Sequence, residues 1–255
     1  MIYLDNAATM RTSEVAIDAM MPYMRTIYGN PSSLHSAGQQ ANEALFSARE
    51  KLAALIGATF KEVYFTSGGS ESDNQAIISA ARIGARKGKK HIISTKIEHH
   101  AVLHTLEKLK NNGFEITLLD VGESGIVSVE DVKNASRDDT LLVSVMYANN
   151  EIGTVQPIAE IGKICREKGV LFHTDAVQAV GHLKIDVQTD NIDLMSISAH
   201  KFGGPKGVGA LYARKGVLLT SLIEAERRKT ISARERKIYP LSSAWSPRSR
   251  NRLMI

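Results

Sequence analysis

Short apolar runs alternate with amphipathic segments along most of the chain. Runs with the length and composition of strands lie at 63–66, 91–95, 116–120, 141–147, 170–174, 193–197 and 209–212. Apolar residues at helical spacing, bounded by capping and turn residues, predict helices at 13–24, 41–56, 67–87, 101–111 and 158–168. This alternation predicts an α/β fold with a mostly parallel sheet that helices cover on both faces.

Polar residues gather where the predicted strands end. In parallel α/β sheets, ligands bind beyond the carboxyl ends of the strands. We therefore expect the polar clusters to meet in one site. They lie at 68–70, 98–100, 149–151, 175–178 and 200–201.

Lys201 is the first candidate for chemistry. It follows a buried run and precedes a loop rich in glycine and proline, within SISAHKFGGPKG at 196–207. Apolar surroundings lower the pKa of a lysine and leave more of the neutral amine, which suits Schiff-base chemistry. On this segment alone, an ordinary exposed loop lysine is the simpler interpretation.

A second segment, LFHTDAVQAVG at 171–181, favours the chemical interpretation. There another apolar run ends in Asp175, and Gln178 follows three residues later. A lysine that forms a Schiff base, together with a buried carboxylate that pairs with a pyridinium nitrogen, is the combination that pyridoxal phosphate needs.

Two further segments fit this picture but are weak by themselves. Gly69 and Ser70 precede a predicted helix, whose N-terminus attracts phosphate, although such a turn is also a common helix cap. His99 could stack on an aromatic cofactor or exchange protons, although a lone histidine is more often structural. His99 and His100 are adjacent and point apart, and no further ligand has suitable spacing, so we expect no metal site.

Composition narrows the class of protein. The 255 residues are enough for one large domain or two small ones, and no apolar run approaches the length needed to span a membrane. The net charge of +5 comes from residues 225–255, which contain nine basic and two acidic residues and so carry +7. The rest of the chain therefore carries −2. This distribution argues against nucleic-acid binding by the whole protein. A single cysteine, Cys165, and an N-terminus without a secretion signal indicate a reducing, cytoplasmic location.

Taken together, the motifs resemble the cysteine desulfurases, fold-type-I pyridoxal-phosphate enzymes grouped with the class-V aminotransferases. The resemblance covers residues 1–223 and predicts the cofactor-binding large domain with an N-terminal arm. It implies pyridoxal phosphate as cofactor and a homodimer. The segments that carry it are YLDNAAT, YGNPSSLH, FTSGGSESDN, EHHAV, NNEIGTVQPI, HTDAVQAVG and SAHKFGGPKGVGALY.

The resemblance also implies a reaction and its partners. The substrate would be L-cysteine, whose sulfur would leave as a persulfide on the enzyme, with alanine as the other product. A sulfur-acceptor or scaffold protein would then take the sulfur for iron–sulfur cluster or thio-cofactor synthesis. Another class-V enzyme, such as a selenocysteine lyase or a small-amino-acid aminotransferase, is the alternative. A non-catalytic remnant that only dimerises is a further one.

The roles of individual residues follow from the same resemblance. Lys201 would carry the cofactor as a Schiff base, Asp175 would pair with the pyridine nitrogen, and Gln178 would bond its phenolic oxygen. His99 would stack on the ring as a candidate acid/base, and Asn150 would lie near the phenolic oxygen and the substrate. The phosphate would be held by Gly69, Ser70, Ser198 and His200, and the substrate carboxylate would face Asn30.

The chain departs from the family after residue 223. The family's persulfide-forming cysteine and a substrate-binding arginine lie well beyond the lysine, in a region that these 255 residues do not contain. Residues 224–255 are basic and show neither helical nor strand periodicity, so we interpret them as a tail foreign to the family. We therefore expect the small C-terminal domain to be missing and this chain to be inactive.

The tail predicts a shift of the reading frame. With suitable codons for residues 231–251, the shifted frame encodes QRAGTENIPAIVGMVAAVEE, which resembles the segment that the family has at this position. We expect a frameshift between Ile223 and Lys229, in the gene or in its sequencing. Re-sequencing this region checks the expectation, and an undisturbed frame would identify the tail as natural divergent sequence.

Overall fold

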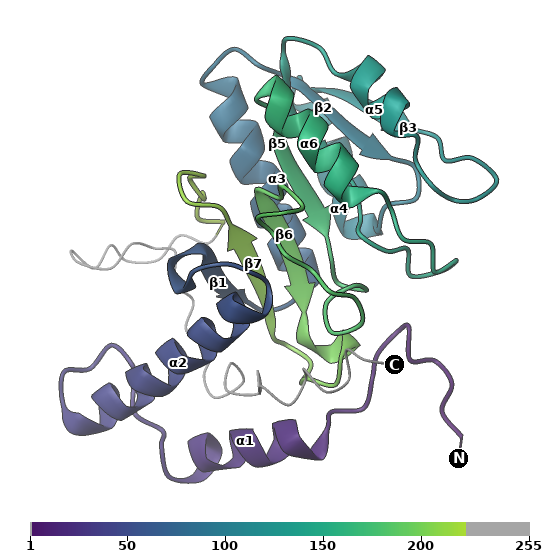
Figure 1. The fold of residues 1–255 in the computed structure, drawn as a ribbon. Helices are drawn as coiled ribbons and strands as arrows, with labels where there is room; N and C mark the ends of the chain where they lie inside the picture. Colours follow the sequence, from purple (N-terminus) through teal and green to yellow (C-terminus); the bar gives the residue numbers. More distant parts are fainter. Residues whose placement is uncertain (1, 223–255) are drawn as a thin grey trace.

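A computed structural model describes residues 2–222 as a seven-stranded sheet with helices on both faces, which confirms the predicted α/β class (Figure 1). The strands lie in the order β1-β7-β6-β5-β4-β2-β3. Neighbours from β6 to β3 are parallel, whereas β7 runs antiparallel to both β1 and β6. The strands are β1 (Val63–Thr66), β2 (His91–Thr95), β3 (Glu115–Leu119), β4 (Thr140–Ser144), β5 (Leu171–Asp175), β6 (Leu194–Ser198) and β7 (Gly209–Ala213).

The helices divide between the two faces of the sheet. Figure 1 shows α5 and α6 in front of the strands and α3 and α4 behind them. Two 3-10 turns, η1 and η2, lie next to strands. The helical bounds are α1 (Glu14–Arg25), α2 (Ser36–Leu55), η1 (Phe60–Glu62), α3 (Gly69–Ala85), α4 (His100–Asn111), α5 (Val129–Ala135), α6 (Ile158–Lys168) and η2 (Ala199–Lys201).

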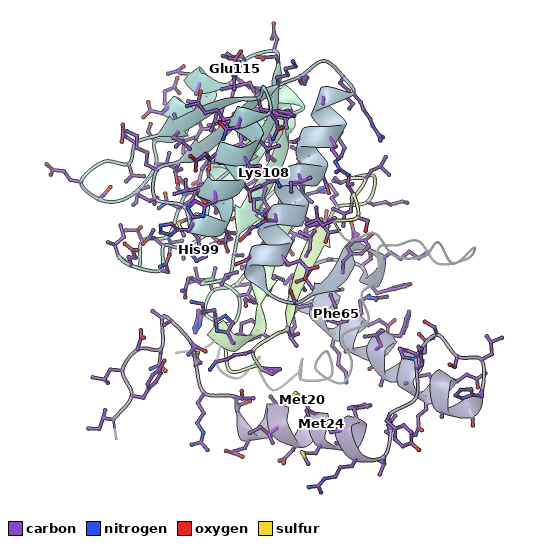
Figure 2. All side chains as sticks on the ribbon, turned by 180° about the vertical axis from the view of Figure 1, so that it is seen from behind. Met20, Met24, Phe65, His99, Lys108 and Glu115 are labelled. Carbon is purple, nitrogen blue, oxygen red and sulfur yellow. The ribbon has the colours of Figure 1, made fainter. Side chains whose placement is uncertain are left out.

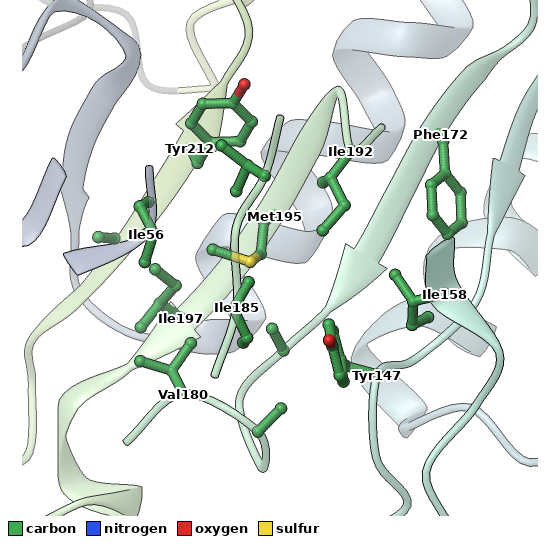
Figure 3. Close-up of a cluster of buried hydrophobic side chains, with 14 of the residues drawn as sticks. Ile56, Tyr147, Ile158, Phe172, Val180, Ile185, Ile192, Met195, Ile197 and Tyr212 are labelled. Carbon is green, nitrogen blue, oxygen red and sulfur yellow. The ribbon is translucent and has the colours of Figure 1, made fainter. Parts of the chain in front are cut away.

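Each face of the sheet buries its own hydrophobic cluster. On one face, Phe172, Met195 and Tyr212 of neighbouring strands pack with Ile158 of α6 (Figure 3). On the other face, α3 and α4 pack against the sheet through residues such as Ile77. Strands β2, β4 and β6 are therefore buried along their whole length, and each contributes apolar residues to both clusters.

The first two helices extend from the β1 edge of the sheet (Figure 1). The hydroxyl of Ser13 caps α1 by accepting a hydrogen bond from the amide of Ala16 at 3.2 Å. Met20 is buried and Met24 is 54% exposed, and both project from this helix in Figure 2. None of the helices within residues 2–222 is long and apolar enough to cross a membrane.

Several predicted boundaries differ from the structure. Helix α5 was not predicted because seven residues with few apolar positions show no clear helical period. Helix α2 begins at Ser36 rather than 41, since its first turn is polar. Strand β4 ends at Ser144 rather than 147, although the Tyr147 amide still donates to the Asp175 carbonyl at 2.8 Å. The predicted tail at 224–255, and the expected frameshift, lie outside the described residues.

The close approach of α6 to the loop before β6 generates a prediction. A Cβ on Gly162 would lie 2.1 Å from the carbonyl oxygen of Asp190, which is backbone and cannot swing aside. Overpacking of this kind costs about 1–3 kcal/mol or more, against a gain of about 1 kcal/mol in helix propensity. We expect Gly162→Ala to lower the free energy of unfolding by about 1–2 kcal/mol, measured by urea denaturation.

Lys163→Ala is the matched control because Lys163 is the next residue of α6 and is exposed. Surface substitutions of this kind change the free energy of unfolding by less than about 0.5 kcal/mol. Equal urea midpoints for the two variants would show that the helix and the loop do not pack this closely.

Candidate functional site

A pocket of about 420 Å³ opens at the edge of the sheet where β2, β4, β5 and β6 end. Loops from five parts of the chain and the N-terminal arm form its wall. Every residue that the sequence predicted for cofactor binding lines it: Gly69, Ser70, His99, Asn150, Asp175, Gln178, Ser198, His200 and Lys201. The expectation that the polar clusters meet at one edge is therefore met.

Asn30 is the exception among the predicted site residues. It lies in the exposed loop between α1 and α2 and does not line the pocket. Its side-chain oxygen accepts a hydrogen bond from the amide of Ser32 at 2.9 Å. The structure thus gives Asn30 a role in its own loop, and its contact with a substrate carboxylate remains a prediction.

Lys201 enters the pocket from η2, the turn that continues β6. Its Nζ donates a hydrogen bond to the carbonyl oxygen of Ala7 in the N-terminal arm, at 2.5 Å. Partial burial lowers the pKa of Lys201, and the negative charges of Asp175 and Asp5 oppose that shift. A lowered pKa leaves more of the lysine as the neutral, nucleophilic amine.

Asp175 ends β5 and is buried at the base of the pocket. One carboxylate oxygen accepts a hydrogen bond from the amide of Val177 at 2.9 Å. Burial raises the pKa of Asp175, while the Val177 amide and then the nearby His99 and Lys201 oppose the shift. Asp175 is therefore a buried carboxyl whose negative charge is stabilised by donors and cations on the pocket side.

His99 stands at the start of α4, as Figure 2 shows. Its Nδ1 accepts a hydrogen bond from the amide of Ala101 at 3.1 Å, so a neutral ring carries its proton on Nε2. Across the pocket, Nε2 of Gln178 donates to the Ala7 carbonyl at 3.0 Å. One carbonyl of the arm thus accepts hydrogen bonds from both Gln178 and Lys201.

The two adjacent asparagines after β4 have different environments. The side-chain oxygen of Asn149 accepts from the amides of Glu151 and Ile152 at 2.8 and 3.0 Å, and this shapes the turn. Its amide nitrogen donates to the Ile97 carbonyl at 3.0 Å, which ties the turn to the loop before His99. Asn150 is left on the pocket wall.

The opposite end of the pocket is suited to an anion. Helix α3 starts at Gly69, and no side chain caps it at Gly68, so the amides of its first turn are available. The hydroxyl of Ser198 and the ring of His200 adjoin this turn, and His200 is bonded to the Thr9 hydroxyl at 3.1 Å. A Cβ on Gly209 would lie 2.6 Å from the Cα of Gly68, so only glycine lets β7 pass this close.

Among the residues of the pocket wall that sequence reasoning did not single out, Asp73 is a buried carboxyl. This aspartate lies in α3, is 1% exposed, and its Oδ1 has no hydrogen-bond partner within residues 2–222. The signal was its place on the apolar face of the helix, three and four residues before the buried Ala76 and Ile77. Carboxyl groups are rare on the buried face of a helix, so an aspartate at this position is a candidate functional residue.

Glu98 is a second buried carboxyl that was not singled out. Its Oε1 accepts hydrogen bonds from the Thr95 hydroxyl at 2.7 Å and from the Met146 amide at 2.9 Å. Burial raises the pKa of Glu98 to about 8, although both hydrogen bonds oppose the shift. Glu98 directly precedes His99, so it supports the turn that presents the imidazole.

The pocket can hold a phosphorylated aromatic ring or a cation. Lys201, Asp175 and the first turn of α3 offer an amine, a carboxylate and an anion site to one ligand. Asp73, His99 and Asp175 also place one nitrogen and two oxygen atoms within 4.8 Å of one another, which would suit a divalent metal. The experiments below separate these two kinds of ligand.

Comparison with known proteins connects this geometry to a family. The profile of the class-V aminotransferases matches residues 2–241. Cysteine desulfurase IscS of Clostridium botulinum (strain Hall) is 54% identical over 222 residues, which are 87% of this chain and 56% of that protein. Cysteine desulfurase IscS of Methanosarcina thermophila is 54% identical over 230 residues, 89% of this chain and 57% of that protein. The chain thus spans somewhat more than half the length of these relatives.

Solved structures agree with this result. The structure described as SspA in complex with cysteine superposes with a TM-score of 0.91 at 38% identity and covers 96% of this chain and 71% of that one. A NifS-like protein superposes with a TM-score of 0.87 at 38% identity, covering 97% and 68%. The fold is therefore that of the large domain of pyridoxal-phosphate-dependent transferases. The chain belongs to the class-V aminotransferase family, and the relatives to which it is similar include cysteine desulfurases.

Proposed function

We propose that this chain is the pyridoxal-phosphate-binding part of a cysteine desulfurase. The observation that carries the proposal is the meeting of Lys201, Asp175 and the uncapped start of α3 in one pocket. An amine, a buried carboxylate and an anion site are the three groups that this cofactor needs. Membership of the family supports the same choice.

The residues present fit the cofactor. Lys201 would hold its aldehyde carbon, Asp175 its ring nitrogen, and the amides at Gly69 and Ser70 its phosphate, with Ser198 and His200 completing the phosphate site. His99 would lie against the ring, and Gln178 and Asn150 would face its phenolic oxygen. When bound, the cofactor supplies an electron sink for bond breaking next to an amino group.

Side chains of the protein would bind and transfer protons next to the bound cofactor. A negative Asp175 would keep a proton on the ring nitrogen, because a charge pair at a buried carboxylate is much stronger than in water. The lowered pKa of Lys201 makes Nζ a suitable base for the substrate's α-proton. His99 presents a proton on Nε2 if its ring is neutral. Ala7 and Ala8 of the arm line the pocket and exclude water from one side of it.

We propose L-cysteine as the substrate, since the relatives are cysteine desulfurases and one related structure is described in complex with cysteine. Sulfur transfer also needs a thiolate that can reach the substrate. Cys165 cannot supply it: the side chain is buried in α6, and burial raises its pKa to about 12. The receiving thiol must therefore come from outside these 255 residues.

The remaining assignments follow the family and are proposals of the same kind. The sulfur would pass to an acceptor or scaffold protein for iron–sulfur cluster or thio-cofactor synthesis, and the working form would be a homodimer. The pocket residues would equally serve a selenocysteine lyase or an amino-group transfer, so the assay must include their substrates.

Cofactor binding through Lys201 is the first test. The 255-residue protein with added pyridoxal phosphate should gain the visible absorbance of the bound cofactor, and borohydride should then attach the cofactor permanently to Lys201, as peptide mass spectrometry would show. Lys201→Ala should lose the attached cofactor completely, whereas the exposed Lys184→Ala should retain it.

Two results would contradict this assignment. One is a Lys201→Ala protein that still yields the borohydride-fixed adduct. The other is an absorbance that a metal chelator removes, because Asp73, His99 and Asp175 would then be serving a metal.

Sulfide release is the second test. With L-cysteine, a reductant and pyridoxal phosphate, we expect no catalytic sulfide release from this chain, because its one thiol is buried and protonated at neutral pH. Cys165→Ala should leave that result unchanged, and a chain with the family reading frame restored after residue 223 serves as the positive control. Parallel incubations with L-selenocysteine and with glyoxylate test the alternative reactions.

Repeated turnover by the short chain, abolished in Cys165→Ala, would identify Cys165 as the nucleophile and overturn this account. Turnover only with selenocysteine or glyoxylate would replace the desulfurase by one of the alternatives. Dimerisation without any turnover or cofactor binding would favour a non-catalytic remnant.

A further inference from the structure

Asp73 lies at the base of the pocket and is not explained by the functions assigned so far. It sits in the second turn of α3, is 1% exposed, and lines the same cavity as Asp175. Its Oδ1 is buried and has no hydrogen-bond partner within residues 2–222. A buried ionised carboxylate without a partner is among the most costly groups in a protein interior.

The basic group nearest to Asp73 gives it no charge partner. Nε2 of His173 lies 3.7 Å from Oδ1 of Asp73. The imidazole, however, is fully buried and bridges two hydroxyls, Ser144 at 2.8 Å and Ser196 at 3.0 Å. Burial lowers the pKa of His173 to about 3, so the ring is neutral at pH 7. The contact between Asp73 and His173 is therefore not an ion pair.

More groups stabilise a negative charge on Asp175 than on Asp73. Asp175 accepts a hydrogen bond from the Val177 amide, and His99 and Lys201 face it from the pocket. Oxygens of Asp73 and Asp175 lie within 4.8 Å of each other. Glu98 is a third buried carboxyl, which raises the pKa of Asp73 and whose own pKa Asp175 raises. Several negative charges so close in a buried cluster would repel strongly, so the proton goes to the carboxyl that has fewer stabilising groups.

We propose that Asp73 is an uncharged carboxylic acid, so that Asp73 and Asp175 together carry a single negative charge, located on Asp175. Burial and then the charge of Asp175 raise the pKa of Asp73 well above its usual value, which agrees with this assignment. The hydrogen bond between Asp73 and Ser196 opposes that shift, but burial and the charge of Asp175 outweigh it. Once protonated, Asp73 becomes the donor in this contact, next to the hydrogen bonds that His173 makes with Ser144 and Ser196.

Asp73 is thereby a positioning residue that acts through Asp175. One negative charge matches the one positive charge of a protonated pyridine ring, and a second would be left uncompensated in the pocket. This role of Asp73 in matching the charge of the cofactor rests on the proposed function, because it supposes that pyridoxal phosphate binds. The protonation state itself can be measured on protein without cofactor.

The first experiment measures the carboxyl groups directly. Infrared difference spectra of ¹³C-aspartate-labelled protein at pH 7, without cofactor, compare each variant with the parent chain. Asp73→Asn should lose a band of a protonated carboxyl group, whereas Asp175→Asn should lose a carboxylate band. The exposed Asp131→Asn serves as the reference for loss of an ordinary carboxylate.

The second experiment measures the cofactor. A second charge within 5 Å would shift a titration in the site by about two pH units, at the effective dielectric typical of proteins. If Asp73 is uncharged, Asp73→Asn should move the pH transition of the bound cofactor's absorbance by less than about half a unit. Asp73→Leu removes the hydrogen-bond donor and should weaken cofactor binding about tenfold, and Asn should rescue it.

Each outcome is decisive. Loss of a carboxylate band in Asp73→Asn, or a shift of about two pH units in its cofactor titration, would show that Asp73 is ionised and overturn the proposal. Equal binding by the Asn and Leu variants would remove its role as a hydrogen-bond donor. Failure of the parent chain to bind pyridoxal phosphate would sink the proposed function alone, since the infrared result does not depend on the cofactor.

Discussion

Desolvation of acidic groups at one edge of the sheet is the constraint on which this pocket depends. The strands are buried on both faces, so charged side chains can reach a ligand only where the strands end. Asp73, Glu98 and Asp175 are nevertheless all buried there. A charge survives in such a place only if donors or cations face it, and the structure supplies both to Asp175. The distribution of donors thus decides which acid is ionised.

A layer of polar side chains beneath the pocket, formed by Ser144, His173 and Ser196, affects which groups are available to stabilise the buried acids. His173 lies two residues before Asp175 on β5, so both side chains project from the same face of the strand. Ser144 of β4 and Ser196 of β6 flank the imidazole from the two neighbouring strands. The hydrogen bonds of this layer are made by neutral groups, so the cation near Asp175 is Lys201 on the pocket side. Fold and electrostatics are therefore set by the same three parallel strands.

Residues next to strand ends were predictable, whereas residues inside helices were not. Lys201 and Asp175 each follow an apolar run, and the rule that ligands bind at the carboxyl edge was enough to bring them together. Asp73 was not predicted as a site residue because its burial depends on which side of α3 packs against the sheet. The sequence of the helix alone does not show this. Asn30 shows the opposite limit, because a motif located it in a loop but could not say where that loop lies. Helix α5 was missed because its sequence is too short for a period to emerge.

The carbonyl of Ala7 has a consequence for how the pocket fills. It already accepts hydrogen bonds from Lys201 and Gln178, two groups that an incoming ligand would need for itself. Under the proposed function, filling the pocket is an exchange of hydrogen-bond partners, in which the Ala7 carbonyl competes with the ligand for the same donors. Such competition reduces the apparent affinity for the ligand to the intrinsic affinity multiplied by the fraction of chains in which the arm has left the pocket. The N-terminal arm is in this sense a tethered competitor, present at a high and constant local concentration, which any change in the length or sequence of the arm would retune.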